Sequence, residues 1–168
     1  MVKKIILALV LTVGVALLQS TVLSRFVIYI HAVPDLTLGI LVYSAYVNGT
    51  MAGQLTGFFS GVLLDFLSSA PLGLNAFVRT IIGALTGVLK DTFYLDFIFL
   101  PMALCAGATV IKVLFFFLLH LLFPQTVPSY SLWALTFWVE LGLNVLTAPL
   151  LFGLLKLFGP LLAMPKER

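Results

Sequence analysis

Four charged side chains lie inside long apolar runs of this sequence, where a charge is costly and marks a candidate functional site. They are Asp65, Arg79, Lys112 and Glu140. Asp65 ends one run and Arg79 follows early in the next, so a helical hairpin would place both at similar depth, as a pair. Lys112 lies about 15 Å from the end of its run and Glu140 about 12 Å into the next, at 1.5 Å per helical residue. A second pair is therefore expected.

Two kinds of chemistry fit these pairs. Mutual neutralisation would fix the register of neighbouring helices, whereas a proton or substrate path would use the same residues as relay groups. A path of that kind usually needs more polar residues in line, so the pattern favours neutralisation.

Nothing in the sequence predicts an enzyme. His31 and His120 have no Cys or carboxylate at metal-ligand spacing. The sequence contains no Gly-rich phosphate loop with Lys, no H-E-x-x-H and no G-x-S-x-G. We therefore expect no catalytic residues, no metal and no cofactor.

The composition is that of a membrane protein. The chain has 168 residues, of which 62% are hydrophobic and only 9% charged, whereas a soluble protein carries roughly 25% charged residues to cover its surface. This excludes an ordinary soluble enzyme and a disordered chain. The net charge of +3 comes from scattered cations, so we expect no nucleic acid as a partner and membrane lipid as the surroundings.

The apolar runs predict an all-α membrane protein with six transmembrane helices in a single integral membrane domain. The expected spans are about 5–24, 34–48, 51–68, 74–89, 97–123 and 132–158. The second span begins at Pro34 and Asp35, a typical helix start. It is only about 22 Å long against a core of roughly 30 Å. A re-entrant segment, or fusion with the third span, is therefore the alternative.

The placement of Lys and Arg favours six spans over five. Six spans with the N-terminus inside collect six cations on the cytoplasmic side and leave Arg25 outside. The cytoplasmic cations are Lys3, Lys4, Lys90, Lys156, Lys166 and Arg168. Both termini are expected in the cytoplasm.

Glycines recur every fourth residue in two successive predicted helices. The first ridge runs through Gly49, Gly53, Gly57 and Gly61 to Asp65. The second runs from Asn75 through Arg79, Gly83 and Gly87 to Asp91. Small residues let helix backbones approach closely in lipid. The ridges predict close packing within this hairpin, and the alternative is an exposed ridge that binds a partner's helix.

Residues 34–90 resemble the MreD family of rod shape-determining proteins. The stretch from Gly57 to Asp65, G-F-F-S-G-V-L-L-D, is similar to the family's G-F-x-x-G-L-L-x-D core, with Val62 in place of a commoner Leu. The other matching motif residues are Pro34, Asp35, Pro71 and Gly73. The last third of the chain carries no recognisable family motif.

The resemblance implies a non-enzymatic scaffold or regulator of cell-wall elongation and peptidoglycan synthesis in the bacterial inner membrane. It implies MreC as a partner, with RodA, its penicillin-binding transpeptidase partner and MreB. It also implies a fold similar to the six-helix substrate-binding components of energy-coupling-factor vitamin transporters. The alternative function is therefore a vitamin-like small-molecule-binding subunit of a transporter. The outer loops expected at residues 68–73 and 124–131 are short and uncharged, which favours the scaffold.

Overall fold

The computed structural model describes residues 2–21, 32–68, 70–92, 98–127, 129 and 133–157. These residues form six α-helices and no strand, which confirms the all-helical prediction. The helices are α1 (Val2–Thr21), α3 (Leu36–Asn48), α4 (Thr50–Leu67), α5 (Leu74–Val88), α6 (Phe99–Leu122) and α7 (Leu135–Leu157). Each overlaps one of the six expected segments. The likeness to energy-coupling-factor components stays a prediction.

Two glycines with positive φ separate the helices of the first half. Gly49 (φ 93°) lies between α3 and α4, and Gly73 (φ 94°) immediately precedes α5. A positive φ is unfavourable for residues with a Cβ, so glycine is preferred there. It ends one helix and lets the next begin without a long loop between them. As a result α3, α4 and α5 follow one another closely, and α3 is not fused with α4 into one continuous helix.

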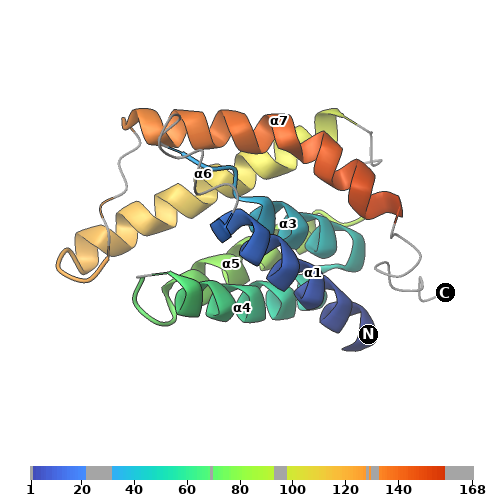
Figure 1. Cartoon of the computed structure of the whole chain (residues 1–168), viewed down its shortest axis with the longest axis horizontal. Helices are drawn as coiled ribbons and strands as arrows, with labels where there is room; N and C mark the ends of the chain where they lie inside the picture. The colour runs from blue at the N-terminus through green and yellow to red at the C-terminus, as the bar shows by residue number, and fades with distance from the viewer. Residues whose placement is uncertain are drawn as a thin grey trace.

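Helix α3 lies at the centre of the bundle and contacts each of the other five helices. Figure 1 shows α6 and α7 along one side, α4 and α5 along the other, and α1 across the front of α3 and α4. Leu38, Leu41 and Val42 are almost completely buried. The ring of Tyr43 meets that of Phe152 from α7 edge-on, with centroids 5.2 Å apart. The short α3 is therefore the core of the fold.

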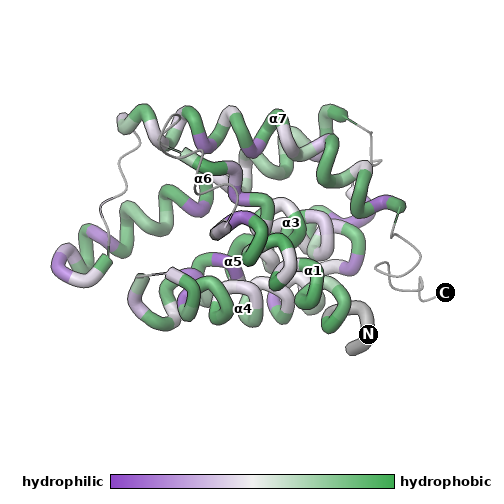
Figure 2. Tube along the Cα trace, viewed as in Figure 1, coloured by the Kyte–Doolittle hydropathy of each residue, from purple (hydrophilic) through white to green (hydrophobic). Residues whose placement is uncertain are grey.

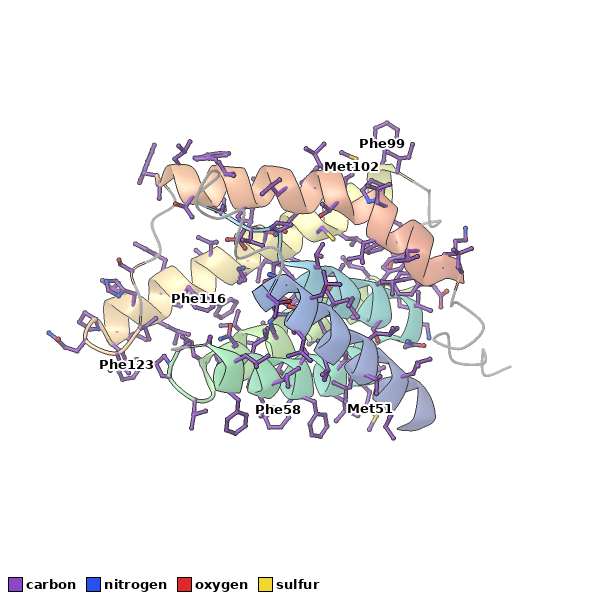
Figure 3. The ribbon with its side chains drawn as sticks, in the orientation of Figure 1. Met51, Phe58, Phe99, Met102, Phe116 and Phe123 are labelled. Atoms are coloured by element: carbon purple, nitrogen blue, oxygen red, sulfur yellow. The ribbon has the colours of Figure 1, made fainter. Side chains whose placement is uncertain are left out.

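The surface of the bundle is apolar. Met51, Phe58 and Phe99 are exposed and point away from the neighbouring helices (Figure 3). Hydrophobic positions dominate the outer helices, with hydrophilic ones interspersed along α5, α6 and α7 (Figure 2). Helices α6 and α7, of 24 and 23 residues, are long and apolar enough to cross a membrane, while α1, α3 and α5 contain shorter apolar helices. These features fit a lipid environment.

The two ends of the bundle differ. The start of α1 and the end of α7 lie on one side in Figure 1, together with the junction of α3 and α4. The α4–α5 turn and the end of α6 lie on the opposite side. We call this second side the turn end of the bundle.

Candidate functional site

Asp35 begins the central helix and lies inside the protein. Its Oδ1 accepts hydrogen bonds from the backbone N–H of Leu38 at 2.9 Å and from the hydroxyl of Thr37 at 2.8 Å. A carboxylate in this position caps the helix and opposes the positive end of its dipole. The carboxylate predicted at this helix start is therefore confirmed as its cap, whereas Pro34 precedes the cap and is not the first helical residue. The capping holds the carboxylate in one orientation.

Two cations from two other helices bind the same carboxylate. Nη2 of Arg79, on α5, donates to Oδ1 and Oδ2 of Asp35, both at 2.8 Å. Nζ of Lys112, on α6, donates to Oδ2 at 3.1 Å. Arg79 is only 3% exposed and Asp35 and Lys112 each 12%. The three groups are thus largely shielded from solvent.

Helix α7 completes the cluster through Glu140 and Asn144. Lys112 Nζ also donates to Oε1 of Glu140, so the pair expected from their depths is present. The amide of Asn144 accepts from the backbone N–H of Asp35 at 2.6 Å and donates to Thr109 Oγ1 at 2.9 Å. These contacts join α7 to both α3 and α6.

We refer to Asp35, Arg79, Lys112 and Glu140 as the ion cluster. It contains two cations and two anions, so its members are together formally neutral. It connects four helices, α3, α5, α6 and α7, at one point. Buried charges are tolerated when they are paired in this way, and removal of one leaves its partner uncompensated. The geometry therefore supports a role in fixing how the α6–α7 hairpin sits on the rest of the bundle.

The predicted pair of Asp65 with Arg79 is wrong. Asp65 instead accepts from the backbone N–H groups of Gly73, Asn75 and Ala76, at 2.9, 2.9 and 3.2 Å. It caps the start of α5 from the neighbouring helix, where the first N–H groups have no partner within the helix. Asp65 does lie beside α5, as its depth predicted. It binds the N–H groups at the start of that helix, whereas the Arg79 side chain binds Asp35.

The glycine ridges pack against each other inside the α4–α5 hairpin. A Cβ on Gly53 would lie 2.3 Å from the carbonyl oxygen of Gly83, and one on Gly57 would lie 2.3 Å from that of Arg79. A Cβ on Gly61 would lie 2.3 Å from Cα of Ala76, and one on Gly87 would lie 2.5 Å from Cα of Thr50. These contacts support the packing interpretation over a ridge that is open to a partner. Gly49 differs, since its role is the positive φ between helices.

Sequence reasoning missed Asn144 and Thr109 as members of the site. It placed Asp35 at a helix start and in the family motif, but it did not predict that Arg79 and Lys112 would bind this carboxylate. The sequence did offer a signal for Asn144, because its amide lies in an otherwise apolar helix. Polar side chains in lipid-embedded helices often hydrogen-bond to a neighbouring helix. The other motif residues, Pro71 and Gly73, form the α4–α5 turn whose backbone Asp65 holds.

The histidines give no metal site among the residues described. His120 Nδ1 donates to the backbone carbonyl of Val127 at 2.7 Å, and His31 lies outside the described residues. In those same parts of the chain, no three His, Cys, Asp or Glu side chains gather as a metal site would require.

Fold and site together define an all-helical protein with an apolar surface and an ion cluster buried between four of its helices. Residues 2–158 match the family model for the rod shape-determining protein MreD, and the chain belongs to that family. The family is a membrane protein family with a role in determining rod shape. No curated protein and no solved structure gives a significant match.

Proposed function

We propose that this protein is a non-enzymatic scaffold of the cell-wall elongation machinery, embedded in the bacterial inner membrane. Two observations support this proposal: residues 2–158 match the MreD family, and the ion cluster joins four helices of the chain. Its charged groups bind one another across four helices, which is the arrangement expected of a rigid support. A transport or relay site would instead orient such groups toward a ligand.

The exposed surface supports partners that are themselves membrane-embedded. Large apolar side chains cover the outer faces of α4, α6 and α7, including Phe58, Leu118 and Leu150. Such surfaces suit the transmembrane helix of a bitopic protein such as MreC, or the helices of RodA and its transpeptidase partner. MreB would contact the cytoplasmic side.

Co-purification tests this function. A tagged copy, expressed in rod-shaped cells depleted of their own MreD-family protein, should restore rod shape. It should also co-purify with MreC or a cell-wall synthase after extraction in mild detergent. A tagged membrane protein of unrelated family and similar size is the control. Recovery of an energy-coupling ATPase in place of these partners would contradict the scaffold and support the transport alternative.

The proposed topology places both termini in the cytoplasm and the turn end of the bundle outside. In a Cys105→Ser background, Ser68→Cys and Gln125→Cys should react with an impermeant thiol reagent in whole cells, because both positions are exposed at the turn end. Lys90→Cys should react only after the membrane is permeabilised. Labelling of position 90 in intact cells would mean that the orientation or the number of spans is wrong.

A further inference from the structure

An apolar recess of about 250 Å³ lies at the turn end, between the start of α5 and the end of α6. One wall consists of the α4–α5 turn and the first residues of α5, from Pro71 to Leu74 together with Phe77. The other consists of Leu119, Phe123, Thr126 and Val127. Figure 3 shows Phe123 at the end of α6, at the far left of the view.

Hydrogen bonds hold both walls in place. The carboxylate of Asp65 binds the N–H groups of Gly73 and Asn75 behind the first wall. His120 binds the carbonyl of Val127 behind the second, and the Val127 N–H binds the carbonyl of Phe123 at 3.0 Å. The rings of Phe77 and Phe115 meet edge-on at 6.2 Å and join α5 to α6 beside the recess. The space is therefore part of the fold and is not produced by a loose loop.

The lining determines what can occupy the recess. Among the described residues that line it, none is charged, and Thr126 supplies the only side-chain hydroxyl. An apolar cavity of about 150 Å³ already binds benzene, so this recess has room for a longer hydrocarbon. Apolar walls without an occupant lose dispersion contacts, which favours filling by hydrocarbon over filling by water.

The position of the recess identifies the source of that hydrocarbon. Phe77 and Leu119 each lie within about one turn of the end of their helix, where the hydrocarbon core of a bilayer meets the headgroups. The rim residues Leu72, Phe77 and Phe123 are all more than half exposed. A lipid tail therefore reaches the recess without displacing any described part of the protein.

We propose that this recess binds one acyl chain of a phospholipid, which stays with the protein as a bound lipid between the α4–α5 and α6–α7 hairpins. The headgroup would lie outside the recess, because no described lining residue could pair with a charge. This inference goes beyond the scaffold function and does not depend on it.

Native mass spectrometry of the full chain, purified in mild detergent from membranes of defined phospholipid composition, tests the proposal. The unmodified chain should retain one phospholipid. Thr126→Phe should lower the retained fraction at least about tenfold, because the added ring takes the place of several buried methylene groups. Thr136→Phe is the matched control, since Thr136 is exposed on α7 away from the recess, and it should retain lipid as the unmodified chain does. Equal retention by all three chains, or none by the unmodified chain, would overturn the proposal.

A photocross-linking side chain at position 72, in place of Leu72, gives a second measurement that does not rely on the folding of Thr126→Phe. Irradiation of intact membranes should add the mass of a phospholipid to the chain. An adduct with another protein would assign the recess to a protein partner and contradict the lipid. The same group at position 136 controls for lipid that merely surrounds the bundle.

Discussion

Asp35→Ala should destabilise the protein by about 3 to 5 kcal/mol, the cost of breaking a buried ion pair on one side. Lys112 would keep Glu140, but Arg79 would lose the only salt-bridge partner that the described residues provide. Its Nε and Nη1 atoms are already buried without hydrogen-bond partners among the described residues, so those residues offer the guanidinium no second acceptor. Thermal unfolding in detergent and the yield of monodisperse protein measure the loss.

Asp35→Asn distinguishes the contribution of the negative charge from that of the helix cap. Asparagine caps helices about as well as aspartate, so this variant should keep the contact with the Leu38 N–H while it loses the negative charge. Its loss of stability should remain close to that of Asp35→Ala. A much milder effect would mean that capping, not charge, is the main contribution of Asp35.

Double-mutant cycles distinguish the observed pair from the expected one. Asp35→Ala combined with Arg79→Ala should be clearly milder than the sum of the single changes, because the two charges are in direct contact. Asp65→Ala should cost about 0.5 to 2 kcal/mol as a lost helix cap, and its effect should add to that of Arg79→Ala. Strong coupling of Asp65 with Arg79, and none of Asp35, would contradict the cluster.

Gly57→Ala should have the second large effect. Its new methyl group would lie 2.3 Å from the carbonyl oxygen of Arg79 and 2.7 Å from its carbonyl carbon. Backbone atoms cannot rotate away, so α4 and α5 must separate and lose close contacts along the hairpin. Overpacking costs about 1 to 3 kcal/mol where side chains can adjust, and we expect at least the upper value here, with Gly57→Leu more severe still. Unfolding in detergent measures the change.

Gly107→Ala on α6 is the matched control. Nothing lies within 4 Å of a Cβ at Gly107, and alanine favours helix over glycine by roughly 0.5 to 1 kcal/mol, so this change should be neutral or stabilising. Gly39 lies off the ridge but does not serve as a control, because a Cβ there would meet Leu151 of α7 at 2.4 Å. Equal tolerance at positions 57 and 107 would show that the ridges do not pack as described.

The sequence alone determined the class of protein and the main elements. A chain with 9% charged residues cannot cover a water-facing surface. Its apolar runs predicted the six helices, although the second run is shorter than a full membrane span. The four-residue glycine spacing predicted the α4–α5 contact, because residues four apart share one face of a helix. Depth along successive helices also predicted that Lys112 and Glu140 would meet. These are properties of single helices or of hairpins that are adjacent in the sequence.

Only the tertiary structure decided the composition of the ion cluster. Depth along a helix says how far a charge lies from the membrane surface, but not toward which neighbour it faces. Asp35 and Arg79 are 44 residues apart and Asp35 and Asn144 are 109 apart. They meet because the short α3 packs in the centre, with its N-cap residue Asp35 against α5, α6 and α7. Asp65 binds the N–H groups at the start of α5, and Arg79 binds the carboxylate of Asp35, because buried charges bond to the partners that the packing of the helices places beside them.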